Sequence, residues 1–307
     1  MPNFLIIGAQ KAGTTSVYRY LRQHPEIYMS PLKEPRFFAF EGENPDFHGP
    51  FRRDPDTPLA GRPRGTVTEL EPYRALYAGV ADETAVGEAS PQYLYSEKAP
   101  GRIRHHLPDA KLIAILRDPA ERAYSHFLMA RREGHEPLTD FARALEAEEG
   151  RVRANWWIGH YKRMGYYHQQ LSRYCDLFEP DQIRVYLYED LGEDPVGTMR
   201  GILRFLGVDE SLVPDTYVRH NVSGTPRSRA LHTLISKPNP LKRAVTPFLP
   251  DALRKRIFAG LRDRNLVASP PIPEAAREEL TEAYRDDVLQ LQRLIGRDLS
   301  GWLGERP

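Results

Sequence analysis

The sequence predicts an α/β fold in which a mostly parallel β-sheet is flanked by helices. Short apolar runs that indicate buried strands occur near residues 4, 85, 112 and 184. Stretches with apolar residues at helical spacing separate these runs, and such alternation is typical of parallel sheets with crossover helices on both faces. A long amphipathic helix is predicted over residues 273–295, where Leu280, Tyr284, Val288 and Leu291 recur three or four residues apart.

The first element is a strand over residues 4–7, which Gly8 ends. A loop of small residues follows, and helical spacing begins at Thr14 and continues to Leu21. A glycine-rich loop before a helix start presents converging backbone N–H groups, and the helix dipole adds about half a positive charge. The loop is therefore predicted to bind a phosphate group.

This loop differs from the Walker A sequence G-x-x-x-x-G-K-[ST] in the position of its lysine. Gly8 and Gly13 have the Walker spacing, but Thr14 takes the place of the lysine and Lys11 lies inside the loop. A lysine there is expected to face the phosphate edge from which a leaving group departs, rather than to lie along a triphosphate. A tight turn without a ligand is the alternative interpretation.

Composition narrows the functional classes. The 307 residues suffice for one large α/β domain with insertions or for two modest domains. A charged fraction of 28% and a formal net charge of +1 are typical of a globular protein and exclude a nucleic-acid-binding polycation. The single cysteine, Cys175, forms no internal disulfide. No apolar run near the N-terminus suits a signal peptide or a membrane span, so we expect a cytoplasmic location.

Glu34 lies in the segment that follows the first predicted helix. Pro31 and Pro35 restrict helix growth around it, so Glu34 is expected on a constrained turn near the glycine loop. A positioned carboxylate that takes the proton of an attacking hydroxyl contributes about 10²–10⁴-fold to a rate. An ion pair with Lys33 or Arg36 is the alternative role of this side chain.

Glu88 lies at the end of the strand predicted from Thr84. Ser90 follows it, in the loop that leads to Tyr95. The carboxyl ends of parallel strands are where such sheets bind ligands, so Glu88 is expected near a ligand site. In the alternative interpretation, Glu88 is a structural residue at the strand end that caps a helix.

An arginine follows the clearest buried strand, which is predicted over residues 111–116. This residue is Arg117, and Ser125 lies eight residues further on, in the helix that comes next. Arginine suits phosphate because its planar guanidinium donates two hydrogen bonds to phosphate oxygens. A salt bridge at the helix start is the alternative role. No acidic residue ends the strand, which disfavours a magnesium site of the Walker B type.

The segment of residues 155–171 concentrates tryptophan and tyrosine together with His160 and His168. Such clusters form either the wall of an acceptor pocket or part of the core, and the core is the commoner role. Neither histidine has cysteine or carboxylate partners at metal-ligand spacing, so no metal site is predicted. Tyr188 and Glu189, after the last strand, are expected to be structural.

Positive charge is concentrated in residues 219–264, which contain eleven lysines or arginines and two acidic residues. Such an imbalance indicates an anionic partner, either a phosphorylated ligand or an acidic carrier protein, and a solvated basic face is the alternative. Arg227, in the sequence NVSGTPRSR, is the candidate for contact with the ligand, and Arg264 is its rival.

The run GAQKAGTTSVYRYLRQHPEI, followed by KEPRFF, resembles the 5′-phosphosulfate loop of sulfotransferases that use 3′-phosphoadenosine 5′-phosphosulfate (PAPS). It is most similar to the branch of heparan-sulfate sulfotransferases and their bacterial small-molecule relatives. GE-x-SP-x-YL, RDPAERAYSHF and REELTEAYRDDVLQLQRLIGRDLSGW resemble later segments of that family, so the resemblance runs from end to end.

The resemblance implies a P-loop-containing nucleotide-binding fold and a single domain over residues 1–307, with acceptor-side insertions near 41–83 and 219–272. It implies that Lys11 and Glu34 are catalytic, with Glu34 as the general base on the acceptor hydroxyl and Glu88, on the acceptor side, as the alternative base. It also implies that Arg117 and Ser125 hold the 3′-phosphate. The residues implied to bind the nucleotide are Lys11, Ala12, Gly13, Thr14, Thr15, Ser16, Arg117, Ser125 and Arg227.

The implied activity is transfer of a sulfuryl group from PAPS, without a metal, to a hydroxyl or, as second choice, an amine. A small molecule, a glycan or a carrier-bound compound is the expected acceptor. A P-loop kinase or NTPase is the first rival, disfavoured by Thr14 in the lysine position. The second rival is an inactive nucleotide-binding module, against which the complete set Lys11, Glu34, Arg117 and Ser125 argues.

Overall fold

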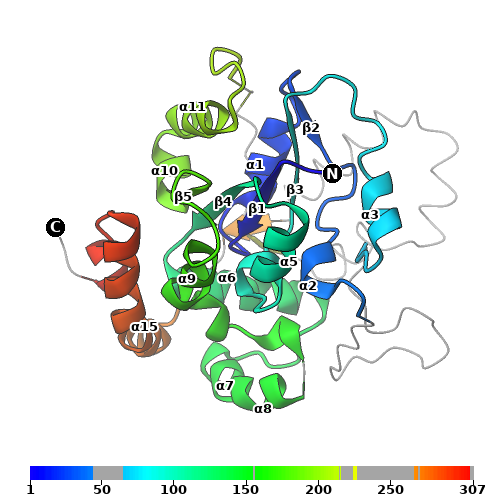
Figure 1. The fold of residues 1–307 in the computed structure, drawn as a ribbon. Coiled ribbons are helices and arrows are strands. Elements are labelled where there is room, and N and C mark those ends of the chain that lie inside the picture. Colours follow the sequence, from blue (N-terminus) through cyan, green and yellow to red (C-terminus); the bar gives the residue numbers. More distant parts are fainter. Residues whose placement is uncertain are drawn as a thin grey trace, which may run out of the picture.

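A five-stranded parallel sheet forms the centre of the molecule (Figure 1). The computed structural model describes residues 1–43, 65–154, 156–213, 215, 224–226, 266–268 and 270–304. The strand order is β2-β3-β1-β4-β5, and every neighbouring pair is parallel. The strands are β1 (Phe4–Gly8), β2 (Ile27–Met29), β3 (Ala85–Ala89), β4 (Lys111–Leu116) and β5 (Ile183–Leu187).

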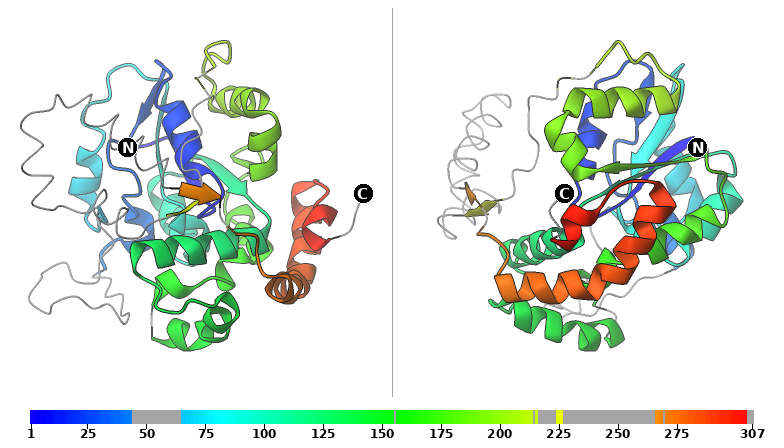
Figure 2. Two further views of the ribbon diagram at one scale, coloured as in Figure 1. Left: turned by 180° about the vertical axis from the view of Figure 1, so that it is seen from behind. Right: turned by 90° about the vertical axis from the view of Figure 1, so that its left-hand side faces the viewer.

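Helices cover both faces of this sheet. Figure 2 shows α1 and α11 on one face and α9 and α15 on the other. The described helices are α1 (Thr14–Leu21), α2 (Phe37–Phe40), α3 (Leu70–Ala75), α4 (Gln92–Tyr95), α5 (Ala99–His106), α6 (Pro119–Glu133), α7 (Phe141–Glu146), α8 (Glu148–Arg153), α9 (Tyr167–Cys175), α10 (Tyr188–Glu193), α11 (Pro195–Leu206) and α15 (Glu274–Ile295). Short 3₁₀ turns are η1 (Trp157–Gly159), η2 (Arg163–Gly165) and η4 (Ser300–Leu303). The predicted fold class is confirmed.

The four predicted strands are all present, but the edge strand β2 was not predicted. It has only three residues, and it pairs with β3 alone. Its sequence is too short for an apolar pattern to stand out. A second small sheet, in which β6 (Gly224–Pro226) pairs antiparallel with β7 (Leu266–Ala268), was also not predicted. Strand β6 lies against α6.

Two helical stretches are interrupted by short breaks. Residues 141–153 divide at Ala147 into α7 and α8. The helical stretch after β5 divides into α10 and α11 at Asp194, whose carboxylate accepts the backbone N–H of Gly197 at 2.8 Å. A side-chain cap of this kind starts a new helix. The long C-terminal helix is confirmed as α15, and Gly296 ends it with φ of 63°.

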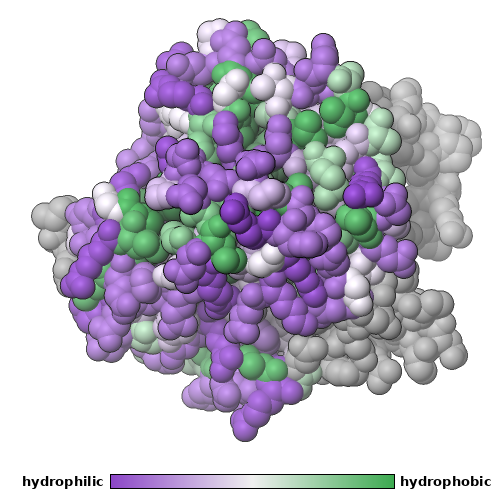
Figure 3. Space-filling model, in the orientation of Figure 1, coloured by the Kyte–Doolittle hydropathy of each residue, from purple (hydrophilic) through white to green (hydrophobic). Residues whose placement is uncertain are grey.

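The surface of the molecule is mainly hydrophilic on the face seen in Figure 3, where hydrophobic residues form small scattered groups. Apolar side chains concentrate instead around the sheet, and all five residues of β1 are buried. None of the helices in the described ranges combines the length and the apolar character that a membrane crossing requires. Of the two expected insertions, residues 44–64 and most of 219–272 lie outside the described residues.

A close approach between two neighbouring strands generates a stability prediction. Phe4 of β1 pairs with Gly87 of β3, and a Cβ atom on Gly87 would lie 2.3 Å from the Phe4 ring. Because both strands are in the core, the ring has little room to move, and Gly87→Ala should lower the free energy of unfolding by about 1–3 kcal/mol in urea titrations.

Gly101→Ala is the matched control for this substitution. Gly101 lies in α5 with nothing within 4 Å of the added Cβ. Replacing a helical glycine by alanine there should stabilise the protein by about 0.5–1 kcal/mol. Equal effects of the two substitutions would contradict the packing assigned to Gly87.

Candidate active site

Three loops meet at the carboxyl ends of the parallel strands. Ala9, after β1, donates its N–H to the carbonyl of Ile115 in β4 at 2.6 Å. Ser90, after β3, donates to the carbonyl of Ile6 at 3.1 Å, and Glu34 donates to the carbonyl of Ala89 at 3.1 Å. These backbone bonds hold the glycine loop, the Glu34 turn and the end of β3 next to one another.

The glycine loop leads directly into the start of α1. Lys11 has φ of 72° and Gly13 has φ of 90°, so the chain turns twice through left-handed conformations. A Cβ atom on Gly13 would lie 3.1 Å from the Tyr188 ring, which explains the need for glycine there. Within the described part of the chain, the N–H groups of Thr14 and Thr15 have no hydrogen-bond acceptor. They are available to an anion at the helix start.

Lys11 is a partly buried cation in this loop. Burial, together with the positive charges of Arg132 and Arg117, lowers the pKa of Lys11 to about 8. The carboxylates of Glu133 and Glu34 act in the opposite direction. Lys11, Glu34 and Arg117, which were predicted separately, are therefore close enough to influence one another electrostatically. A bound polyanion would compensate the clustered positive charge.

Arg117 has the position that its sequence context predicts, directly after β4. Its guanidinium lies 4.8 Å from the centre of the Tyr188 ring and 3.3 Å from the carboxylate of Glu121. The hydroxyl of the buried Tyr167 donates to the Arg117 carbonyl at 3.0 Å and holds the backbone in place. The alternative role, a salt bridge at the helix start, is thus also present. Tyr188, which was expected to be structural, borders the site.

The helix α6 begins beside Arg117 and carries Ser125, which is 9% exposed. Asp118 caps this helix, because its carboxylate accepts the N–H groups of Ala120 at 2.8 Å and Glu121 at 3.0 Å. Arg277 of α15 in turn contacts Asp118 at 3.3 Å and forms an ion pair with Glu121. Neither Tyr167 nor Arg277 was predicted, because both reach the site from distant parts of the chain.

Glu34 forms ion pairs with both of its neighbouring cations, Lys33 and Arg36. Burial opposes ionisation of this carboxyl, but the two cations outweigh it, so the pKa of Glu34 is below its usual value. Its side chain is 23% exposed. The carboxylate is therefore ionised at neutral pH and partly accessible to solvent. The ion pairing with Lys33 and Arg36, which was the alternative interpretation of Glu34, is also present.

Glu88 has the opposite environment, because it is fully buried. Its carboxylate accepts hydrogen bonds from the hydroxyls of Tyr93 at 2.6 Å, Ser90 at 2.8 Å and Tyr73 at 3.3 Å. Burial raises the pKa of Glu88 to about 7. The side chain does not cap a helix, and an acceptor hydroxyl has no direct access to it. Glu34 is therefore the better candidate for the base.

The aromatic segment before α9 belongs mainly to the core, since Tyr161 and Tyr167 are fully buried. His160 Nδ1 and the Tyr95 hydroxyl share a hydrogen bond of 2.9 Å, and burial lowers the pKa of His160 to about 4. In the ranges that the structure describes, no three or more His, Cys, Asp or Glu side chains gather in a way that could hold a metal ion.

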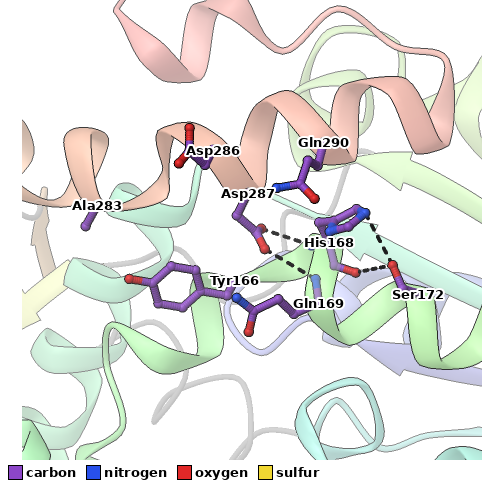
Figure 4. A pocket seen from close by; sticks show the side chains of 8 residues that line it. All are labelled: Tyr166, His168, Gln169, Ser172, Ala283, Asp286, Asp287 and Gln290. Atoms are coloured by element: carbon purple, nitrogen blue, oxygen red, sulfur yellow. Dashed lines mark hydrogen bonds between the residues drawn. The ribbon is translucent and has the colours of Figure 1, made fainter.

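A cavity of about 450 Å³ lies between α9 and α15 (Figure 4). Asp287 points from α15 to the start of α9, where it accepts the N–H groups of His168 at 2.9 Å and Gln169 at 3.2 Å. This carboxylate stabilises the start of the helix that carries Tyr167. None of the predicted catalytic or nucleotide-binding residues lines this cavity.

The basic segment cannot be compared with its prediction. Arg227 and Arg264 both lie outside the described residues. The neighbouring strands β6 and β7 are described, and they pair Pro226 with Leu266.

The chain is similar to known proteins in both sequence and structure. The model of the Sulfotransferase family matches residues 2–211. The chain belongs to the sulfotransferase family. A crystal structure of a sulfotransferase from Alicyclobacillus acidocaldarius is 33% identical, with a TM-score of 0.73 over 98% of each chain.

Curated relatives of this sulfotransferase include heparan sulfate enzymes. Bifunctional heparan sulfate N-deacetylase/N-sulfotransferase 4 of Mus musculus is 27% identical over 99% of this chain, which spans 31% of that relative's length. Heparan sulfate glucosamine 3-O-sulfotransferase 6 of Mus musculus is 28% identical over 98% of this chain and 73% of the relative. The family resemblance inferred from the motifs is confirmed.

The buried charge of Lys11 generates a prediction about stability and pH. In the folded protein Lys11 loses its proton near pH 8, whereas the unfolded chain keeps it to about pH 10.5. Burying this charge therefore destabilises the fold below pH 8, and the penalty fades as pH rises from 8 to 10.5. Without a ligand, Lys11→Met should be more stable than wild type at pH 7 by about 1–3 kcal/mol, and the difference should shrink by pH 10.

Urea unfolding at several pH values measures this difference. Lys98→Met is the control, since the Lys98 side chain is 61% exposed. A stability difference for Lys11→Met that does not change between pH 7 and pH 10 would contradict the buried environment described for Lys11.

Proposed function

We propose that this protein transfers a sulfuryl group from PAPS to a hydroxyl of an acceptor, with amines as the second acceptor class. The observation that carries the proposal is the position of Lys11, a partly buried cation beside the N-terminus of α1 and within electrostatic reach of Arg117 and Glu34. In this cluster Lys11 can balance the charge of a phosphosulfate, Arg117 can bind a second phosphate, and Glu34 can act as the base.

In the proposed reaction the acceptor oxygen attacks sulfur as its proton passes to Glu34. A bond forms between that oxygen and sulfur, and the bond between sulfur and the bridging phosphate oxygen breaks. The leaving group is 3′-phosphoadenosine 5′-phosphate (PAP). Lys11 and the N–H groups at the start of α1 would stabilise the charge that develops on the departing phosphate oxygen. The ionised state of Glu34 suits the role of proton acceptor.

Arg117, Ser125 and Arg227 are the proposed ligands of the 3′-phosphate. The guanidinium of Arg117 now faces the carboxylate of Glu121, and Arg277 offers that carboxylate a second partner. A 3′-phosphate could therefore replace Glu121 on Arg117 without leaving the glutamate unpaired. Holding the nucleotide at both ends fixes the sulfuryl group relative to the acceptor.

The acceptor class can be tested directly. Heparan sulfate enzymes among the relatives favour a glycan, and small molecules or carrier-bound hydroxyls are the other classes that fit. The experiment incubates the chain with PAPS and, in turn, N-deacetylated heparosan oligosaccharide, 2-naphthol and water, and measures PAP release. Phosphoryl transfer from ATP with magnesium, together with no PAP release from PAPS, would instead identify a kinase or NTPase.

Three substitutions should separate the proposed roles. Lys11→Ala should lower kcat by about 10²–10³-fold, since it removes a charge that is most needed in the transition state. Arg117→Ala should mainly weaken PAP binding, because it removes charge-assisted bonds to the 3′-phosphate. Glu34→Gln should lower kcat by about 10²–10⁴-fold with PAP affinity nearly intact. Steady-state PAP release and calorimetric PAP titration measure the two effects.

Glu146→Gln, at an exposed glutamate of α7, is the control for loss of negative charge alone and should resemble wild type. If Glu34→Gln retains turnover within about threefold of wild type, Glu34 does not act as the base.

A further inference from the structure

Glu88 is a buried carboxylate that the proposed reaction does not use. It lies near the end of β3 with no solvent exposure, although a carboxylate in such a place is energetically unfavourable unless hydrogen bonds compensate it. Hydroxyls surround it. Those of Tyr93 and Tyr73 donate to Oε1, and that of Ser90 donates to Oε2.

Two of these hydroxyls also hold the segment that contains Glu34. The Ser90 oxygen accepts the backbone N–H of Arg36 at 3.0 Å, and the Tyr93 oxygen accepts that of Phe38 at 3.4 Å. A hydroxyl has a single proton. Each of these two hydroxyls donates its one hydrogen bond to Glu88. The lone pairs of both hydroxyl oxygens therefore remain available to accept the backbone N–H groups of Arg36 and Phe38.

The turn held in this way has an unfavourable backbone conformation. Glu34 has φ of 62° and Arg36 has φ of 56°, and both are in the left-handed region. Non-glycine residues keep such conformations only where the surroundings impose them. The N–H of Glu34 is bonded to the Ala89 carbonyl at 3.1 Å, so the backbone N–H groups of residues 34, 36 and 38 all donate to the segment of residues 89–93. On the acceptor side, the Pro35 carbonyl receives the N–H of Val67 at 2.8 Å.

We propose that Glu88 is a positioning residue for Glu34, which it holds in place by orienting the Ser90 and Tyr93 hydroxyls toward the backbone of residues 36–38. Glu88 itself touches neither the acceptor nor the nucleotide. The inference rests on the proposed function of Glu34 as the base, and it replaces the earlier interpretation of Glu88 as an alternative base.

The arrangement requires a group that only accepts hydrogen bonds. At pH 8, the pH of the test below, Glu88 is mostly ionised because its pKa is about 7. The ionised carboxylate has two acceptor oxygens and no donor, so it can receive Tyr93, Tyr73 and Ser90 together. A glutamine of the same shape would present an NH₂ group to at least one of these hydroxyls and turn its proton away. That hydroxyl could then no longer accept the N–H of the Glu34 segment in the same geometry.

The test is a double-substitution cycle read in kcat. PAP release from PAPS is measured at pH 8 with the best acceptor among N-deacetylated heparosan oligosaccharide, 2-naphthol and water. The variants are Glu88→Gln, Ser90→Ala and Glu34→Gln, with each of the first two also combined with Glu34→Gln. Tyr77→Phe is the matched control, because the Tyr77 hydroxyl donates to Tyr73 at 3.2 Å and has no bond to the Glu34 segment.

We expect Glu88→Gln and Ser90→Ala each to lower kcat by about 10–100-fold, with KM for PAPS and PAP affinity within about threefold of wild type. Tyr77→Phe should stay within about threefold. In the Glu34→Gln background, neither substitution should cause a further loss greater than threefold, because there is no base left to position. A purely structural role would make the losses multiply.

Three results would overturn the inference. The first is multiplicative loss in the double variants. The second is wild-type kcat in both Glu88→Gln and Ser90→Ala while Glu34→Gln is impaired, which leaves the proposed function intact. The third is a Glu34→Gln variant with wild-type turnover, which refutes the base assignment itself. If Glu88→Gln does not fold, the Ser90→Ala arm of the cycle decides the question.

Discussion

The site depends on one constraint: a positive charge must be kept partly buried at the carboxyl edge of a parallel sheet. The backbone bond from Ala9 to Ile115 ties the glycine loop to β4. The left-handed turns at Lys11 and Gly13 then bring the chain into α1 with its first N–H groups directed outward from the helix. Desolvation of Lys11 destabilises the free protein, and an anionic ligand would relieve this cost.

Two glutamates on neighbouring segments illustrate how environment divides roles between chemically identical groups. The pKa of Glu34 is lowered because Lys33 and Arg36 outweigh the effect of burial, and that of Glu88 is raised to about 7 because it is fully buried. Environments that shift the pKa values of two carboxyl groups in opposite directions are a common feature of acid–base sites. Here the exposed, ionised member suits proton transfer, and the buried member suits the support of its neighbour.

Much of the fold could be predicted because the central strands are continuous apolar runs. Strands β1 and β4 are each flanked by two strands and buried on both faces, which leaves a strong signal in the sequence. Strand β2 carries no such signal, since three residues at a sheet edge are too few to show a period. The glycine loop and Arg117 could be located because each directly follows a recognisable strand, whereas Glu34 was located through the resemblance of KEPRFF to the family.

The supporting contacts could not be predicted, because they depend on the tertiary approach of distant residues. Tyr73 reaches Glu88 from α3, within a stretch that has no sustained period in the sequence. Tyr167 meets the carbonyl of Arg117 across 50 residues of chain, and Arg277 reaches Glu121 from the C-terminal helix. Which of the two carboxylates is exposed is likewise a property of packing. The sequence alone left Glu34 and Glu88 as alternatives.

The central claim is that this edge of the sheet binds a nucleotide that carries phosphate at both the 5′ and the 3′ positions. Calorimetric titration of the purified chain with PAP, with 5′-AMP and with ATP plus magnesium tests it most directly. PAP should bind at least tenfold more tightly than 5′-AMP, because only PAP presents a 3′-phosphate to Arg117. Absence of PAP binding, or tighter binding of ATP with magnesium, would contradict the account.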